Sequence, residues 1–364
     1  MTIKEILLVL EEMAPLAYAE DFDNVGLLVG NPDNEATAVL VCHDALEIVI
    51  DEAIVKNCNL IVCFHPILFS GLKKITGKNY VERSIIKAIK NDIAIYTVHT
   101  ALDNHQYGVN KIFCDALGLE NTKVLIPKQQ FIRKLVTYTV PDNADKVRQS
   151  LFTAGAGSIG NYESCSFNSE GTGTYQGSDN SNPTIGIKGE LTRTTEIKIE
   201  VTFEKHLEQK ILKALFNSHI YEEVAYEIYD LQNSHQNIGL GMIGELPTSL
   251  NERDFLHFVK DKMKADGIRH STYLNKNIKK VAVLGGAGSF AIKHAIQAGA
   301  DAYLTADLKY HQFYEAENRI LLADIGHFES ERYTKNYIVD YLTKKMPNFA
   351  FILSEENTNP VKYL

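Results

Sequence analysis

The sequence has 364 residues, 45% of them hydrophobic, and a formal net charge of -9 at pH 7. This length exceeds the usual size of one domain, so two or three domains are expected. The negative charge disfavours general attraction to nucleic-acid phosphates, and no run reaches the roughly 18 consecutive apolar residues of a membrane span. The first residues lack the basic region and cleavage site of a signal peptide. We therefore expect a soluble, cytoplasmic protein for which nucleic acid is a poor partner.

The five cysteines are scattered along the chain without any C-x-x-C pair. Their odd number and spacing argue against a disulfide framework or a thiolate zinc site, and they fit a reducing compartment. Cys42 and Cys63 fall in expected buried strands. We interpret both as small apolar fillers rather than as nucleophiles.

The N-terminal third predicts alternating strands and helices. Thr2 and Glu5 form a capping-box pattern that predicts a helix to about Leu16, followed by the loop EDFDNVGLLVGN. Short apolar runs then alternate with helical periods, which is typical of a parallel sheet. The expected strands are AVLVC, NLIVCF and IAIYTV, and the expected helices cover about 46–57, 81–90 and 109–117.

The middle of the chain, about residues 133–231, has a different pattern. Two strand-helix-strand patterns follow each other there, and this order resembles a ferredoxin-like fold. The expected elements are KLVTYTV, a helix over 143–154, NYESCSF, EIKIEVTF, a helix over 207–217 and YEEVAYEIYDL, with GTGTYQGSDNSNPTIG as a polar connection. An independent neighbouring domain is the alternative, but the α/β pattern resumes afterwards, which favours an insertion.

The C-terminal third returns to strands alternating with helices. The expected strands are KKVAVLGG, DAYLTA, RILLADIG and FAFIL, and the expected helices cover about 289–298, 308–317 and 329–345. GGAGS lacks the full spacing of a nucleotide-binding loop, so a tight strand-to-helix turn is the better interpretation. The predicted domains are an N-terminal α/β half over 1–128, an inserted α+β domain over 129–233 and a C-terminal α/β half over 234–364.

Two clusters of polar residues follow neighbouring predicted strands. His65 lies in FHP directly after one buried strand, and Asp103 lies in HTALDN after the next. Sequential parallel strands usually lie side by side, so both residues are expected at the carboxyl edge of the sheet, where α/β proteins bind ligands. A histidine at a strand end is often only structural, and Asp103 has the alternative role of capping a turn.

A third cluster, DIGHFESE, places His327 and Glu331 four residues apart, on one face of the expected helix. Helix capping and surface charge are the alternative explanation. Together with His65 and Asp103, these residues supply hard or borderline ligands and no thiolate, which predicts a divalent-metal site. Zn, Mn, Fe and Ni all accept such ligands, and one or two ions per chain are expected.

Two further segments are candidates for the surroundings of the site. TADLKYHQF offers Lys309 and His311, which we predict to hold an anionic substrate or to act as an acid. Their alternative is a helix N-terminus with solvated charges. The loop with Asp23 and Asn24 is either a simple turn or part of the pocket lining.

The motifs DNVGLLVG, FHPILFSGLK, HTALDN, GAGSIGNYESCSFNSEGTGTY, DLKYH and DIGHFESE, in this order, resemble the NIF-three-like family, also labelled GTP cyclohydrolase 1 type 2 homologues. The resemblance covers essentially the whole chain, and the middle resembles the PII-like or CutA-like insert of longer bacterial members. It implies two related α/β halves around a dinuclear metal centre, a ring-shaped homohexamer, and a nucleotide such as GTP as substrate. The family's ligands fall on His65, Asp103, His327 and Glu331.

The chain departs from the family pattern at Phe64, where a first histidine of His-His-Pro is usual, and at Tyr310, where a second histidine is usual. Phenylalanine cannot bind a metal, so one metal position is expected to be weakened or empty. Asp44 matches an aspartate of the family, with His43 as an unusual neighbour. The expected function is metal-dependent hydrolysis of a nucleotide or phosphoester, and the alternative is non-catalytic metal binding, metal delivery or ligand sensing.

Overall fold

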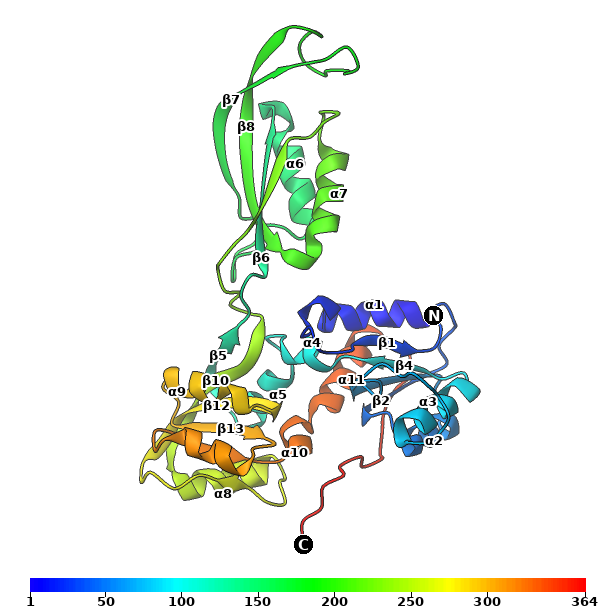
Figure 1. The fold of residues 1–364 in the computed structure, drawn as a ribbon, viewed down its shortest axis with the longest axis vertical. Helices are drawn as coiled ribbons and strands as arrows, with labels where there is room; N and C mark the ends of the chain where they lie inside the picture. Colours follow the sequence, from blue (N-terminus) through cyan, green and yellow to red (C-terminus); the bar gives the residue numbers. More distant parts are fainter. The chain divides into compact units, whose positions relative to one another are not determined.

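The computed structural model describes all residues from Met1 to Leu364. The chain forms two compact units (Figure 1). The first contains residues 1–126 together with 237–364, and the second contains residues 127–236. Both ends of the sequence therefore contribute to the first unit.

The first sheet of this unit has the strand order β1-β4-β3-β2-β15. Its strands are β1 (Gly26–Val29), β2 (Val39–Asp44), β3 (Leu60–His65), β4 (Ala94–Thr97) and β15 (Phe351–Leu353). The strands from β4 to β15 are parallel and β1 is antiparallel at the edge. The apolar runs of β2 and β3 fit a sheet that is covered on both faces. The last strand of the chain thus completes the sheet that the N-terminal third begins.

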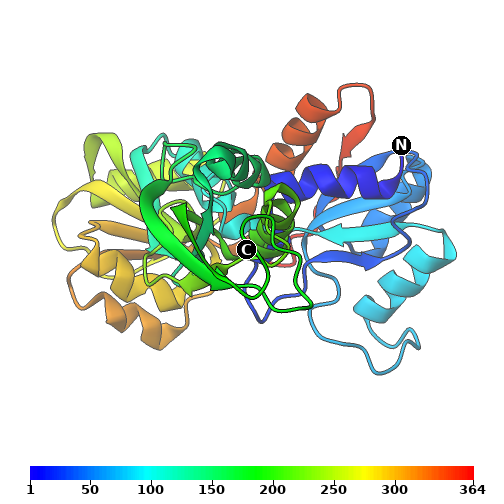
Figure 2. The ribbon, with the colours of Figure 1, turned by 90° about the horizontal axis from the view of Figure 1, so that it is seen from above.

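Helices cover both faces of this sheet. Figure 2 shows α1 (Ile3–Met13) beside α11 (Thr334–Lys345) on one side of the sheet and α3 (Tyr80–Lys90) on the opposite side. The apolar cores agree, because α1 and α11 share one core cluster, whereas α2 (Glu47–Val55) shares another with α3. The first unit therefore contains a three-layer α/β/α half.

The predicted capping box is present at the start of α1. The backbone N–H of Glu5 donates to Thr2 Oγ1 at 3.3 Å, and that of Thr2 donates to Glu5 Oε2 at 2.7 Å. The helix ends at Met13 rather than near Leu16, and a short 3₁₀ helix η1 (Leu16–Tyr18) follows. Pro15 explains the early end, because proline disfavours helical backbone in the residue before it.

The second sheet of this unit has the order β11-β14-β13-β12-β10-β5, and its central strands β12, β13 and β14 are parallel. Its strands are β5 (Glu120–Pro127), β10 (Gly239–Asn251), β11 (Arg269–His270), β12 (Asn277–Ala287), β13 (Ala302–Ala306) and β14 (Leu321–Asp324). β5 comes from the N-terminal third of the chain, so each sheet receives a strand from the other end of the sequence. β5, β10 and β11 were not predicted.

Helices cover this sheet as well. One face packs against α5 (Val109–Ala116) and α8 (Glu252–Lys262), and the other packs against α9 (Ile292–Gln297). The expected helix over 289–298 is divided into η3 (Ser289–Ala291) and α9, and the one over 308–317 is the 3₁₀ helix η4 (Tyr310–Ala316). None of the helices in the structure is both long and apolar enough to cross a membrane.

The second unit contains a four-stranded antiparallel sheet with the order β7-β8-β6-β9. Its elements are β6 (Ile132–Thr139), α6 (Pro141–Ala154), β7 (Phe167–Gln176), β8 (Leu191–Glu204), η2 (Lys205–Leu207), α7 (Glu208–Ser218) and β9 (Tyr226–Asp230). The expected strand at NYESCSF is wrong except for its last residue. The strand starts at Phe167 and includes GTGTYQ, because continuous pairing with β8 outweighs the low strand propensity of glycine.

Candidate metal centre

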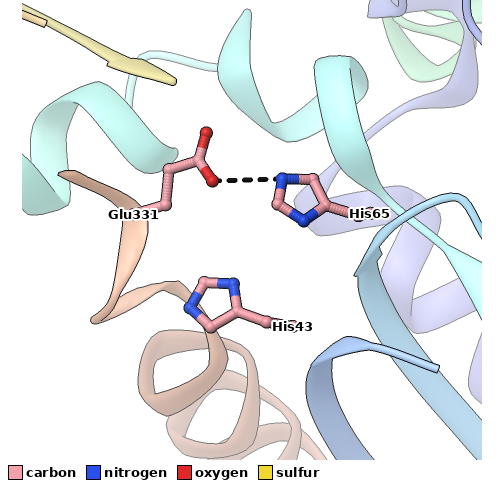
Figure 3. A group of neighbouring side chains, drawn as sticks. All are labelled: His43, His65 and Glu331. Atoms are coloured by element: carbon pink, nitrogen blue, oxygen red, sulfur yellow. Dashed lines mark ion pairs between the residues drawn. The ribbon is translucent and has the colours of Figure 1, made fainter. Parts of the chain in front are cut away.

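The candidate centre lies at the carboxyl ends of two parallel strands of the first unit. β2 ends with His43 and Asp44, β3 ends with His65, and Asp44 pairs with His65 in register. The short helix α10 (His327–Glu331) adds Glu331. His43, His65 and Glu331 each offer one ligand atom, and these atoms lie within 4.8 Å of one another (Figure 3). The three residues could therefore hold a metal ion.

His65 is held between two carboxylates. Its Nδ1 lies 2.9 Å from Asp44 Oδ1, and its Nε2 lies 3.1 Å from Glu331 Oε2. Asp44 is itself fixed by Thr358, whose hydroxyl donates to Asp44 Oδ2 at 2.5 Å. Burial acts to lower the pKa of His65, but Glu331 and Asp44 outweigh it and raise the pKa to about 10. A carboxylate on Nδ1 that leaves Nε2 for the centre is the usual surrounding of a metal-bound histidine.

His327 repeats this arrangement from the other side. Its Nδ1 lies 2.7 Å from Asp307 Oδ2, and its Nε2 lies 3.4 Å from Glu331 Oε2. The Nε2 atoms of His65 and His327 therefore both approach the same oxygen of Glu331. Burial acts to raise the pKa of Glu331, but the two imidazoles more than compensate and lower it. The predicted pairing of His327 with Glu331 on one helical face is present in α10.

That face does not belong to one long helix. The expected helix over 329–345 is divided into α10 and α11, with Arg332 and Tyr333 between them. Gly326 precedes α10 with a φ of +94°, a backbone conformation that favours glycine. A break in the predicted helix thus separates α10 from α11, and α10 is the part that carries His327 and Glu331.

His43 is a further candidate ligand that was not predicted as one. Its side chain is buried, and neither ring nitrogen has a hydrogen-bond partner. Its ring contacts those of Phe328 and Phe64, at ring-centroid distances of 5.0 and 6.0 Å. Burial lowers the pKa of His43 to about 4, so the imidazole is neutral near pH 7 and can donate a lone pair. Its position at the end of a buried strand, beside Asp44, was the available signal.

Asp103 is the last residue of α4 (His99–Asp103), not of a strand-end loop. Its Oδ1 atom is buried and has no hydrogen-bond partner. Burial, and next the charge of Glu331, raise the pKa of Asp103 well above its usual value, whereas His65 and His327 act to lower it. All four residues predicted as ligands therefore interact electrostatically.

Several buried polar atoms of this region lack a hydrogen-bond partner. They are both ring nitrogens of His43, Nε2 of His65, Oδ1 of Asp103 and Oε2 of Glu331. The contact between His65 and Glu331 is within ion-pair distance but does not have the alignment of a hydrogen bond. Each buried, unsatisfied group costs roughly 1–3 kcal/mol, and so many in one place are unusual. A divalent cation could bind one ring nitrogen of His43 together with Nε2 of His65 and Oε2 of Glu331. The imidazole and carboxylate donors therefore fit a metal.

Two glycines of β12 allow the sheet to approach Glu331 closely. A Cβ at Gly286 would lie 2.5 Å from Glu331 Oε1, and a Cβ at Gly285 would lie 3.3 Å from Glu331 Cγ. The backbone N–H of Gly286 donates to Ser330 Oγ at 2.9 Å. Most of GGAGS is therefore the end of β12 rather than only a turn. Its first two glycines make room for the candidate metal ligand Glu331.

The loop around Asp23 lies at the edge of the same region. Asp23 accepts hydrogen bonds from the backbone N–H of Thr100 at 3.1 Å and from His99 Nδ1 at 2.8 Å. Burial acts to raise the pKa of Asp23, but these bonds prevail and lower it to about 2. The ring of His99 lies edge-on to that of His65, at a centroid distance of 5.5 Å. The loop thus positions His99 beside the candidate ligand His65.

Lys309 and His311 lie at the start of η4, and both side chains are exposed. The backbone N–H of Lys309 donates to Gln312 Oε1 at 2.7 Å, and the ring of His311 lies edge-on to Tyr310. Neither makes a hydrogen bond or ion pair with the candidate ligands in the structure. Their role in substrate binding stays a prediction.

The fold and this site define an α/β protein with a candidate metal centre of histidines and carboxylates at the carboxyl edge of its first sheet. The chain belongs to the Duf34/NIF3 (NGG1p interacting factor 3) family, whose model matches residues 1–360. The predicted family is thus confirmed. A Bacillus subtilis relative, named GTP cyclohydrolase 1 type 2 homolog, is 39% identical over 99% of this chain and 98% of its own length.

Solved structures agree with this assignment. The crystal structure of a Bacillus cereus protein related to NIF3 superposes with a TM-score of 0.88 at 37% identity, covering 100% of this chain and 99% of the other. A Staphylococcus aureus protein superposes with a TM-score of 0.80 at 28% identity, with the same coverage.

Proposed function

We propose that the chain is a metal-dependent hydrolase that acts on a nucleotide or another phosphoester. The proposed ligands are His65, Asp103, His327 and Glu331, as predicted, with His43 as an additional ligand. The observation that carries the proposal is the uneven burial of the donors. The side chain of Glu331 is 4% exposed, whereas those of His65 and His327 are 23% and 37% exposed. A site that is closed on one side and open on the other leaves a position for water or substrate, which structural metal sites lack.

A bound divalent ion would supply a water whose pKa falls towards about 7, and it would polarise the substrate. The chain's own residues would keep the donors in place. Asp44 and Asp307 hold the Nδ1 atoms of His65 and His327, which leaves both Nε2 atoms directed at Glu331. Lys309 and His311 would meet the negative charge of a phosphate-bearing substrate.

The names of the relatives and the chemistry of the donors support this substrate class. Relatives at 31% to 39% identity are named GTP cyclohydrolase 1 type 2 homolog, so GTP is the first substrate to test. Phosphate groups and hard carboxylate-bound cations commonly occur together in enzymes. The alternative proposal is a protein that binds or delivers metal without catalysis.

The test combines metal analysis with a screen for hydrolysis of GTP, other nucleotides and simple phosphoesters. Asp103→Ala is compared with wild type and with Asp340→Ala, an exposed position on α11. We expect Asp103→Ala to lose metal and activity together, and Asp340→Ala to keep both. Activity that survives loss of the metal would overturn the hydrolase proposal. Bound metal without turnover of any substrate would favour the non-catalytic alternative.

We further propose the assembly and the domain architecture that the family resemblance implies. The second unit is proposed to be an inserted ferredoxin-like domain, PII-like or CutA-like, which its strand-helix-strand repeat and the order β7-β8-β6-β9 support. The two α/β halves are proposed to form one metal-binding core in a ring-shaped homohexamer, which light scattering would test. The cytoplasmic location stays a prediction from the sequence.

A further inference from the structure

The second unit contains a cavity of about 340 Å³ that is separate from the candidate metal centre. It is lined by residues of β6, β7, β8, the connection after β7 and the segment between α7 and β9. Three of the lining residues are tyrosines: Tyr138, Tyr175 and Tyr221. The cavity is large enough for a small organic molecule.

The strand residues that line the cavity lie on the face of the sheet that points away from α6 and α7. Leu135 and Val201 pair across β6 and β8 and belong to the core that α6 and α7 cover. Tyr138 lies three positions beyond Leu135, so strand alternation directs it to the other face, as it does Glu196 on β8. The cavity therefore uses the sheet face that the unit's own helices leave uncovered.

A hydrogen bond and close packing fix the carboxylate of Glu196 on this face of the sheet. Its Oε1 accepts a hydrogen bond from the Tyr221 hydroxyl at 2.8 Å. A Cβ at Gly173 would lie 2.1 Å from Glu196 Oε2, so only glycine leaves room for this carboxylate beside β7. The rings of Tyr175 and Tyr221 lie 6.2 Å apart. A carboxylate thus lies next to two aromatic rings.

Hydrogen bonds hold the loops around the cavity together without a ligand. The Tyr175 hydroxyl donates to the carbonyl oxygen of Ile185 at 2.9 Å, and Thr184 Oγ1 donates to that of Ile220 at 3.0 Å. The backbone N–H of Asn182 donates to Glu222 Oε1 at 2.6 Å. These bonds tie the connection after β7 to neighbouring parts of the lining, so the cavity is largely preformed.

The charge of the lining selects the kind of ligand. It contains the carboxylates Glu196, Glu222 and Glu223 and no lysine, arginine or histidine. Lys198, which pairs with Tyr138 across the strands, is bound to Glu200 at 2.5 Å. A phosphate-bearing ligand would meet repulsion here, whereas aromatic faces and carboxylates both attract a cation.

We propose that this cavity binds a small organic cation through an alkylammonium or quaternary ammonium group. Tyr138, Tyr175 and Tyr221 supply the aromatic faces, and Glu196 supplies the opposite charge. Rings around a positively charged nitrogen form the same kind of cage that recognises choline and methylated lysine in other proteins. This site is independent of the proposed hydrolase function.

The test uses choline as the probe and the full-length protein, with binding followed by saturation-transfer NMR titration. The uncharged isostere 3,3-dimethylbutan-1-ol and the anion ATP serve as comparison ligands. Glu196→Gln preserves size and removes the charge, and Glu170→Gln is the matched control on the exposed strand β7, outside the cavity lining. Tyr221→Leu removes one ring, and circular dichroism checks that each variant is folded.

We expect choline to bind and the uncharged isostere and ATP to bind at least tenfold more weakly. Glu196→Gln should weaken choline binding by about tenfold, and Glu170→Gln should not change it. The proposal is overturned if choline does not bind, if the uncharged isostere binds equally well, or if both glutamine variants behave alike. Preferential binding of ATP would instead identify an anion site and would also overturn it.

Discussion

The Nε2 atom of His65 lies 3.1 Å from Oε2 of Glu331, although the two residues come from opposite ends of the chain. Nothing in the structure satisfies either atom by a hydrogen bond.

Replacing Glu331 should remove the metal while leaving the fold intact. Glu331→Ala deletes the carboxylate that both His65 and His327 approach, so we expect metal content to fall to background in element analysis. Far-UV circular dichroism should remain that of wild type, and the exposed variant Glu315→Ala should keep its metal. Full metal occupancy in Glu331→Ala would remove Glu331 from the site.

Replacing His43 should weaken metal binding although the sequence motifs do not include it. His43→Ala removes a neutral imidazole whose nitrogens have no other partner. Loss of a residue that only hydrogen-bonds to a metal ligand typically weakens metal affinity by roughly 10–100-fold. We expect His43→Ala to raise the dissociation constant of the metal by more than this. Phe328→Leu, at the adjacent ring, is the control for a packing defect. Equal effects of the two variants in a competition assay with a chelating dye would assign His43 to packing only.

Phe64 should limit the number of metal ions. Its side chain is fully buried, and its ring contacts the rings of His43, His65 and His99. A phenyl ring has no lone pair with which to bind a metal ion. We expect wild type to carry close to one tightly held ion per chain. Phe64→His should raise this towards two, whereas Phe64→Leu should not. Two chelator-resistant ions in wild type would contradict the prediction.

Metal binding should release protons at pH 7. The pKa of His65 is raised to about 10, so its imidazole is protonated in the metal-free protein and must lose a proton to bind the ion. Apparent metal affinity should therefore rise as the pH increases towards 10. Calorimetric titrations in phosphate and Tris, whose ionisation enthalpies differ, should give different apparent enthalpies. Identical enthalpies in both buffers would show that no proton is released.

Gly286 should be intolerant of any side chain. Its φ is +69°, and an added Cβ would lie 2.5 Å from Glu331 Oε1. Gly118 has a similar φ of +65° but open space around it, so Gly118→Ala measures the backbone effect alone. We expect Gly286→Ala to lower the free energy of unfolding by about 1–3 kcal/mol more than Gly118→Ala in urea, and to weaken metal binding. Equal losses in the two variants would show that Glu331 moves aside freely.

Much of the fold could be predicted because its signals are local. The apolar runs before His65 and Asp103 predicted parallel strands, and the structure has β3 and β4 there. Cys42 and Cys63 are buried opposite each other in β2 and β3, as expected for apolar fillers. Strands β5, β10 and β11 were missed, and β1 lies in a segment that was predicted to be a loop. Pairing partners far away in the sequence decide these strands.

The sequence by itself determined the family, the alternation of strands and helices, and the chemical types and spacing of His65, Asp103, His327 and Glu331. Only the tertiary structure decided that β15 joins the N-terminal sheet, that α10 separates from α11, and that His43 is buried beside His65 and Glu331 without a partner. The reason is physical. Residue type and periodicity are local properties, whereas the burial of a polar atom depends on which distant segments pack around it.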